Sequence, residues 1–120
     1  MSRILIVEDS LSELELMSHY LDNGDYKIVK STGAKEAFDI ALKNSIDVIV
    51  SDVVMPEMSG FELCRQLKKD SVTQKLPIIL CTSKNQEIDK LWGFKQGASA
   101  YLTKPYTRKQ LIETIQSVFV

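Results

Sequence analysis

Five short apolar runs, rich in β-branched residues, recur at fairly even intervals along the chain. They cover residues 4–7, 26–29, 48–51, 77–81 and 100–102. Most of these runs are apolar at consecutive positions rather than at every second position, which is typical of strands buried on both faces of a sheet. The pattern therefore predicts five short and largely buried strands.

Between and after these runs, apolar residues recur every three or four positions, which predicts five helices. The helices are expected over residues 11–21, 34–43, 60–68, 86–96 and 108–118. Gly24 and Gly97 follow two of them and are expected to end them. The expected capping residues are Ser10 with Glu13, Thr32 alone, Ser59 with Glu62, and Thr107 with Gln110.

Strands and helices thus alternate five times, and the usual right-handed crossovers would then give a parallel sheet with helices on both faces. The chain of 120 residues is suited to one domain, so we expect a single domain over residues 1–120 with no attached output domain. The hydrophobic content of 44% and the charged content of 26% are ordinary for a soluble protein with a core.

Charge and cysteine content exclude several classes of function. The 15 basic and 16 acidic residues nearly cancel, so bulk electrostatics give no reason to expect direct binding of nucleic acid. No apolar run approaches the length of a membrane span, and no membrane insertion is expected. Cys64 and Cys81 lack metal-type or redox spacing, which favours a reduced cytoplasmic protein with two packing cysteines.

Polar residues stand directly after four of the five predicted strands. Because the carboxyl ends of parallel strands meet along one edge of a sheet, these residues are expected to converge on one crevice. They are Glu8 and Asp9 after the first strand, Asp52 after the third, Thr82 and Ser83 after the fourth, and, after the fifth, Lys104, which Pro105 follows.

This set of side chains suits the transfer of a phosphoryl group. Clustered carboxylates repel one another unless a cation lies between them, and their hard oxygen atoms suit Mg²⁺. Lys104 and Thr82 offer the positive charge and the hydroxyl donor that a phosphoryl group binds. A carboxylate can itself accept the group as an aspartyl phosphate. Asp52, isolated at its strand end, is the best candidate for the acceptor, and Glu8 and Asp9 are better metal ligands.

The chain resembles the CheY-like receiver domains of two-component response regulators over its whole length. The resemblance is carried by Glu8-Asp9, by Asp52 with Met55-Pro56 and Gly60, by Thr82-Ser83, and by Lys104-Pro105. It implies a flavodoxin-like, doubly wound α/β fold with five parallel strands in the order 2-1-3-4-5 and five helices.

The same resemblance implies a role for each acid. Asp52 would accept a phosphoryl group from the histidine of a sensor kinase, either CheA-like or hybrid. Mg²⁺ would be bound directly by Asp9 and Asp52, through water by Glu8, and by the backbone carbonyl of Val54. The protein would be a switch that catalyses only its own phosphoryl transfer and dephosphorylation, and not otherwise an enzyme.

The resemblance also implies how the signal leaves the site. Lys104 would pair with the phosphoryl oxygens, Thr82 would move towards them, and Tyr101 would change rotamer with it. The Lys104–Pro105 peptide bond is expected to be cis. Partner binding would change across the fourth helix, the fifth strand and the fifth helix, in a monomer or weak dimer whose output partner is unknown.

A finer resemblance, over residues 86–105, is to the single-domain regulators of type IV pilus motility, the PilH-like group, and Trp92-Gly93 is its main carrier. It favours motility or chemotaxis-like signalling. The alternatives are a phosphate sink or shuttle in a phosphorelay, or control of another process. Trp92 could be a core or a contact residue, and we expect core or partial burial.

Two positions depart from fast-cycling receivers, in which a polar side chain two residues after the acceptor helps to place the attacking water. Val54 stands there, so slow spontaneous dephosphorylation is expected. Lys84, two residues after Thr82, could contact the phosphate or a partner.

The residues at the strand ends argue against three other functional classes. An aspartyl-nucleophile phosphatase would need an acid at position 54, where Val54 stands. A flavin or nucleotide module would need a phosphate loop where Glu8 and Asp9 stand. A receiver-like protein that no longer accepts phosphate is disfavoured because no expected site residue is missing.

Overall fold

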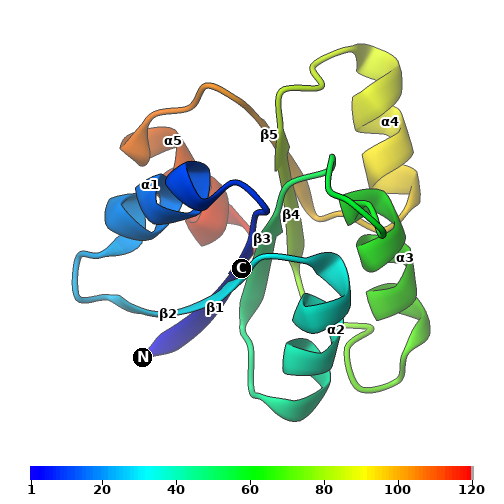
Figure 1. The fold of residues 1–120 in the computed structure, drawn as a ribbon, viewed down its shortest axis with the longest axis horizontal. Coiled ribbons are helices and arrows are strands. Elements are labelled where there is room, and N and C mark those ends of the chain that lie inside the picture. Colours follow the sequence, from blue (N-terminus) through cyan, green and yellow to red (C-terminus); the bar gives the residue numbers. More distant parts are fainter. Residues whose placement is uncertain (120) are drawn as a thin grey trace.

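The five predicted strands pair in parallel into one sheet in the computed structural model, which describes residues 1–119 (Figure 1). They are β1 (Ser2–Val7), β2 (Tyr26–Ser31), β3 (Val48–Ser51), β4 (Ile78–Thr82) and β5 (Ala100–Thr103). The helices between and after them are α1 (Leu11–Leu21), α2 (Ala34–Lys43), α3 (Gly60–Lys69), α4 (Glu87–Lys95) and α5 (Arg108–Ser117). The order in the sheet is β2-β1-β3-β4-β5, which confirms the predicted flavodoxin-like topology.

Backbone hydrogen bonds continue past the strand ends and fix the residues that follow them. The Asp52 N–H donates to the Val7 carbonyl oxygen at 3.0 Å, and the Glu8 N–H donates to the Ser31 carbonyl oxygen at 3.1 Å. The Lys104 N–H donates to the Thr82 carbonyl oxygen at 2.9 Å. The ends of neighbouring strands are therefore held in a common register at one edge of the sheet.

Side chains of the central strands alternate between two cores, as the period of two in a strand requires. Leu5 and Ile49 are buried with residues of α2 and α3, whereas Ile4, Val48 and Val50 are buried with residues of α1 and α5. In Figure 1, α1 and α5 accordingly cover one face of the sheet, and α2, α3 and α4 cover the other. The consecutive apolar runs reflect this burial on both faces.

The helix starts follow three of the predicted cap residues, although of the predicted pairs only Thr107 with Gln110 forms a reciprocal capping box. Ser10, Ser59 and Thr107 are the N-cap residues of α1, α3 and α5, as predicted. The assignment of Thr32 as the cap of α2 is wrong, because the N-cap is Gly33. Strand β2 extends beyond the predicted residues 26–29 and pairs with β1 as far as Ser31. Thr32 therefore lies in the turn between the strand and the helix.

Helix α4 buries fewer residues than its neighbours. Gly93 is its one buried residue, whereas α3 buries four residues. A Cβ atom at Gly93 would lie 3.1 Å from both the Leu80 Cδ1 and the Tyr101 Cδ2 atoms, so the absence of a side chain permits this packing. Trp92 is 45% exposed, so of the expected core or partial burial the core position is wrong.

The two cysteines are free and buried, as expected for packing residues. Each is neutral at ordinary pH, because burial raises the pKa of the Cys64 thiol to about 11 and that of the Cys81 thiol to about 12. Among residues 1–119, no helix combines the length and the apolar character that crossing a membrane would need.

Candidate functional site

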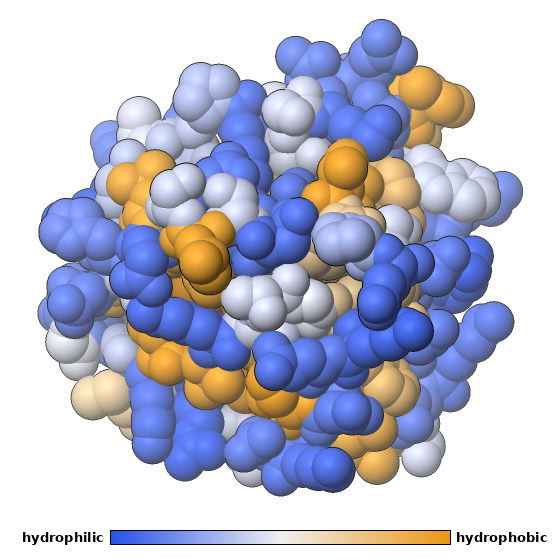
Figure 2. All heavy atoms as spheres, in the orientation of Figure 1, coloured by the Kyte–Doolittle hydropathy of each residue, from blue (hydrophilic) through white to orange (hydrophobic). Residues whose placement is uncertain are grey.

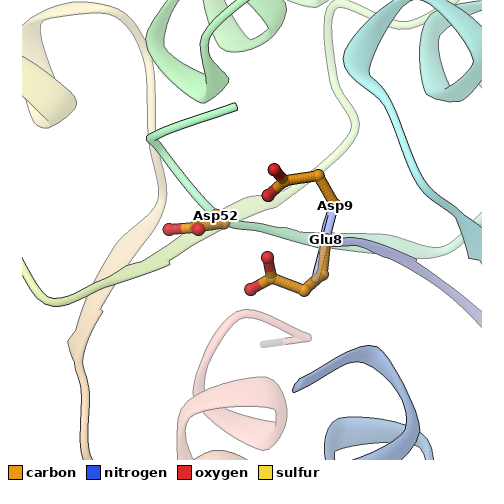
Figure 3. A group of neighbouring side chains, drawn as sticks. All are labelled: Glu8, Asp9 and Asp52. Carbon is orange, nitrogen blue, oxygen red and sulfur yellow. The ribbon is translucent and has the colours of Figure 1, made fainter. Parts of the chain in front are cut away.

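Three carboxylates meet at the carboxyl edge of the sheet, as the order of the strands predicted. Glu8, Asp9 and Asp52 each offer an oxygen atom within 4.8 Å of the others. In Figure 3 the three side chains extend to the same side of the ends of β1 and β3. Glu8 is fully buried and Asp52 is 8% exposed, whereas Asp9 is exposed. The cluster therefore has a buried base and an open rim.

Glu8 is the most tightly bound of the three acids. Its Oε1 atom accepts a hydrogen bond from Lys104 Nζ at 2.7 Å, and its Oε2 atom accepts one from the Ser10 N–H at 3.2 Å. Burial raises the pKa of the Glu8 carboxyl group above its ordinary value, and the hydrogen bond from Lys104 opposes that rise. Because both oxygen atoms are engaged, Glu8 has little freedom to turn.

Asp52 is held by the backbone around it. Its Oδ1 atom accepts a hydrogen bond from the Val53 N–H at 2.8 Å, and its Oδ2 atom lies 3.6 Å from Lys104 Nζ. The Gly60 N–H donates to the Val53 carbonyl oxygen at 2.8 Å. A Cβ atom at Gly60 would collide with the Asp52 carbonyl oxygen, so the start of α3 needs a glycine to approach β3 this closely.

Lys104 brings a positive charge among these acids from the end of β5. Its Nζ atom also donates to Glu13 Oε1 at 3.0 Å, so three carboxylates surround one ammonium group. Burial alone would lower the pKa of the Lys104 ammonium group, but its hydrogen bonds to Glu8 and Glu13 and the charge of Asp52 raise it above its ordinary value. Lys104 is therefore a permanent cation in the site.

Thr82 and Val54 line a cavity of about 490 Å³ that opens beside Asp52 and Lys104. Thr82 is buried, and its Oγ1 atom accepts a hydrogen bond from the Lys84 N–H at 3.4 Å. The Val54 side chain is 58% exposed at the rim. The remaining wall residues are Glu13, Leu16, Tyr20, Ser83, Pro105 and Tyr106. The site thus combines charged groups with an accessible and partly apolar cavity.

Tyr101 lies outside this cavity but is linked to it through one backbone unit. Its hydroxyl group donates to the Lys84 carbonyl oxygen at 2.7 Å, while the Lys84 N–H bonds Thr82. The ring packs on Gly93 of α4. Burial raises the pKa of Tyr101 to about 12, so the hydroxyl group stays protonated and can donate. The Lys104–Pro105 peptide bond is cis, as predicted.

Known protein families include one whose sequence pattern this chain matches. A family model described as the response regulator receiver domain matches residues 4–116. The chain belongs to this family. Receiver domains are the switch modules of response regulators, so the identity predicted from the strand-end residues is confirmed.

Several known proteins resemble this receiver domain closely. The protein PilH of Pseudomonas aeruginosa is 41% identical over 118 residues, which cover 98% of each chain. The chemotaxis response regulator CheY4 of Vibrio cholerae is 35% identical, with a TM-score of 0.92 and 98% of each chain covered. Other curated relatives are transcriptional regulators, and the chain spans about half of their length.

One solved structure that resembles the receiver domain carries a metal. It is the receiver domain of a sensor histidine kinase of Pseudomonas aeruginosa, described with a magnesium ion coordinated in its active site cleft. Its TM-score is 0.91 at 23% identity, over 99% of this chain and 98% of that one, which shows a shared fold.

The donor set of the receiver domain fits a divalent cation by its own geometry. Three carboxylate oxygens from Glu8, Asp9 and Asp52 lie within 4.8 Å of one another, and carboxylate oxygen is a preferred ligand of Mg²⁺. Lys104 balances part of their charge from one side, whereas Asp9 is open to solvent. A cation could therefore approach from the rim without displacing the lysine from Glu8.

Sequence reasoning missed Glu13 as a residue of the site. Its position three residues after Ser10 indicated a capping box, which assigned its carboxylate to the helix start. In the structure that carboxylate bonds Lys104 instead. Glu13 and Lys104 are separated by 91 residues along the chain, so no local pattern links them. The available signal is the helical periodicity alone, which places Glu13 one turn into α1.

Proposed function

We propose that this receiver domain acts as a response regulator that accepts a phosphoryl group on Asp52 from the histidine of a sensor kinase. The observation that carries the proposal is the environment of the Asp52 carboxylate. It combines a cation 3.6 Å away, two further acids, and an adjoining cavity of about 490 Å³.

The transfer is a displacement at phosphorus. An Asp52 carboxylate oxygen forms the new O–P bond and the P–N bond to the kinase histidine breaks. The histidine ring, protonated on its other nitrogen, keeps the bonding electron pair and leaves as a neutral imidazole. Positioning and electrostatic stabilisation supply most of the rate in such reactions. The hydrogen bond from the Val53 N–H to Oδ1 orients the carboxylate for this step.

Mg²⁺ is the cofactor that the acids fit, with Asp9 and Asp52 as direct ligands, Glu8 as a ligand through water, and the Val54 carbonyl oxygen as the backbone ligand. Bound there, it would supply positive charge to the phosphoryl oxygens. The carboxylate cluster of Glu8, Asp9 and Asp52 supports this assignment.

Lys104 and Thr82 then bind the phosphoryl group from the other side. Lys104 carries a permanent charge and lies 3.6 Å from the Asp52 carboxylate. The Thr82 hydroxyl group lines the same cavity, and after a rotation it would donate to a phosphoryl oxygen. Both interactions develop only when phosphate is present, so they stabilise the phosphorylated state.

The response passes from Thr82 to Tyr101 through the backbone of Lys84. A rotation of Thr82 removes its acceptor from the Lys84 N–H, and the Lys84 carbonyl oxygen holds the Tyr101 hydroxyl group. Tyr101 packs on Gly93, so a new Tyr101 rotamer would change how α4 packs against the sheet. Phosphorylation would thereby shift a pre-existing equilibrium of the α4-β5-α5 face.

The α4 end of this face is suited to binding another protein. Ile88, Leu91 and Trp92 are exposed and lie on one helix with Lys95. Figure 2 shows a hydrophobic group at the outer edge of the α4 region, among hydrophilic residues. Aromatic and aliphatic side chains of this kind form the centres of protein interfaces. We propose an output through a protein partner, in a cytoplasmic monomer or weak dimer.

The pathway that the similarity favours is type IV pilus motility. The 41% identity with PilH over nearly the whole of both chains supports it. A role as phosphate sink or shuttle in a phosphorelay is the second candidate. The match covers 98% of PilH, which leaves little of that protein for a separate output domain. A protein whose output is the transfer of its phosphoryl group needs no output domain, so this similarity supports the second candidate as well.

The test is phosphorylation by acetyl phosphate in the presence of Mg²⁺, followed by intact-mass measurement. Wild type is expected to gain the mass of one phosphoryl group, and Asp52→Asn is expected to gain none. Asp39→Asn, which removes an exposed acid from α2, is the matched control and is expected to behave as wild type. Equal incorporation by wild type and Asp52→Asn would contradict the proposal.

The lifetime of the phosphorylated state is a second observable. Val54 places an apolar side chain at the rim where a polar group could orient water, so spontaneous loss of the phosphoryl group should be slow. Mass measurement after removal of the phosphodonor gives the half-life. A half-life of seconds without an added phosphatase would contradict this expectation, and Val54→Asn is expected to shorten the half-life.

A further inference from the structure

The first turn of α1 is built differently from the first turns of α4 and α5. In α5, Gln110 returns a hydrogen bond from its side chain to the backbone N–H of its cap, and Asp89 does the same in α4. In α1, the Ser10 N–H donates to Glu8 Oε2 instead, at 3.2 Å. The carboxylate of Glu13, at the equivalent position, is thus free to bind elsewhere.

Glu13 uses that freedom to bind the lysine of the site. Its Oε1 atom lies 3.0 Å from Lys104 Nζ, which is closer than the 3.6 Å between Lys104 Nζ and Asp52 Oδ2. The distance to Glu13 is that of a hydrogen bond, whereas the distance to Asp52 is beyond the usual range. Lys104 is therefore drawn towards α1 and away from the acceptor.

The two close partners of Lys104 differ in how readily they can release it. Glu8 is fully buried and both of its carboxylate oxygens are engaged. The Glu13 side chain is 47% exposed, so its carboxylate can turn into water at low cost. When a new anion forms on Asp52, Glu13 is the partner that Lys104 can exchange for it.

We propose that Glu13 is a positioning residue that holds Lys104 away from Asp52 before phosphorylation and competes with the phosphoryl oxygens for the lysine. This inference rests on the proposed phosphorylation of Asp52. Among the described residues, the Glu13 side chain has its hydrogen bond with Lys104 and none with the acceptor or the proposed metal ligands. It acts through the position of one ammonium group. It therefore slows phosphoryl transfer and weakens the binding of a phosphoryl group already in place.

The first test removes the charge of Glu13 and preserves its shape. Glu13→Gln is expected to be phosphorylated by acetyl phosphate about 1.5 to 5 times faster than wild type, and to bind beryllofluoride more tightly by a similar factor, as for a half-exposed ion pair. Beryllofluoride with Mg²⁺ reports binding without any chemical step. The matched control is Glu15→Gln, because Glu15 lies on the same helix and pairs with Lys30 at 2.9 Å. It is expected to leave both quantities unchanged.

A second variant separates the contact from the electrostatic field of the carboxylate. Glu13→Asp keeps the negative charge but withdraws it by one methylene group, so it can no longer bond Lys104 at the same distance. We expect it to match Glu13→Gln in rate and in beryllofluoride affinity. If Glu13→Asp behaves as wild type while Glu13→Gln is faster, the effect is one of charge alone and the inference is overturned.

A double-mutant cycle tests whether Glu13 acts through the lysine. In a Lys104→Gln background, replacing Glu13 by Gln is expected to change the slow phosphorylation rate very little, because the interaction is already absent. An undiminished acceleration in that background would overturn the inference. Urea unfolding of every variant establishes that the rates are compared between folded proteins.

The two proposals fail in different ways. If Asp52→Asn gains as much phosphoryl mass as wild type, the proposed function is wrong. If wild type is phosphorylated on Asp52 but Glu13→Gln, Glu13→Asp and wild type have equal rates and equal beryllofluoride affinities, the role of Glu13 alone is wrong.

Discussion

The carboxyl edge of the sheet and helix α4 lie next to each other but are held in opposite ways. At the edge, Glu8 and Asp52 are fixed by backbone bonds to neighbouring strands and by Lys104. In α4, Gly93 is the one buried residue, and large apolar side chains such as Leu91 face solvent. The first region is ordered by many mutual constraints, and the second is ordered by few.

This difference suits the two tasks of a receiver domain. Phosphoryl transfer needs groups that are held in place before the reaction. A change of partner needs an element with alternative positions of similar free energy, and weakly packed elements supply these most readily. The backbone of Lys84 joins the two regions, because Thr82 bonds its N–H and Tyr101 bonds its carbonyl oxygen.

The largest effect is expected from removing the lysine at the carboxyl edge of the sheet. Lys104→Met should slow phosphorylation of Asp52 by acetyl phosphate about 100-fold, because a fixed cation beside the developing charge is lost. Lys30→Met is the matched control, since Lys30 also pairs with a glutamate but on the outside of the protein. Single-turnover mass measurements give the rates, and a rate for Lys104→Met close to wild type would contradict the role of the lysine.

The close packing of the same region can be tested with a variant that leaves every charged side chain unchanged. Gly60→Ala should lower the free energy of unfolding by about 3 kcal/mol, the upper part of the range for overpacking, because its Cβ atom meets the Asp52 carbonyl oxygen. Gly33→Ala is the control, since no atom lies within 4 Å of the Cβ position there. Urea unfolding midpoints measure both, and equal midpoints would show that the contact at Asp52 is not tight.

A smaller effect is expected from the contact that anchors α4. Gly93→Val should lower the free energy of unfolding by about 1 to 2 kcal/mol, because its side chain meets Leu80 and Tyr101. Leu91→Val, on the exposed side of the same helix, should change it by less than about 0.5 kcal/mol. Phosphorylation rates should stay near wild type in both. A loss of phosphorylation in Gly93→Val would show that the two regions are not separable.

The smallest effect concerns the two cysteines, which report on local opening. Their pKa values of about 11 for Cys64 and about 12 for Cys81 lie above the ordinary value, so both stay protonated and unreactive at pH 8 until the protein opens. The Cys64 thiol bonds the carbonyl oxygen of Gln96, the residue that ends α4. We expect a thiol reagent to label Cys64 severalfold faster than Cys81 in the native protein, and equally in urea. Faster labelling of Cys81 would reverse the comparison.

The sequence predicts the sheet edge better than it predicts the helix surfaces. Consecutive apolar residues identify strands buried on both faces, and a parallel sheet brings their ends together whatever the helices do. Glu8, Asp9, Asp52 and Lys104 were therefore predicted as neighbours, and they are neighbours in the structure. Their roles in phosphoryl transfer and metal binding stay predictions.

The features that the sequence did not predict depend on packing between distant segments. Trp92 lies in a helix with apolar residues on several sides, so periodicity does not reveal which side meets the sheet. The bond between Glu13 and Lys104 depends on how α1 rests against the end of β5. Thr32 was misassigned as a cap because pairing extends β2 beyond its apolar residues, to Ser31.

Val54 adjoins the acceptor, but its side chain is 58% exposed and contributes little to the core. If Asp52 accepts the phosphoryl group as proposed, a replacement of Val54 would change the group that faces the attacking water while costing little in stability, as is usual at exposed positions. The lifetime of the phosphorylated state and the stability of the fold would then be adjustable independently, through one exposed residue.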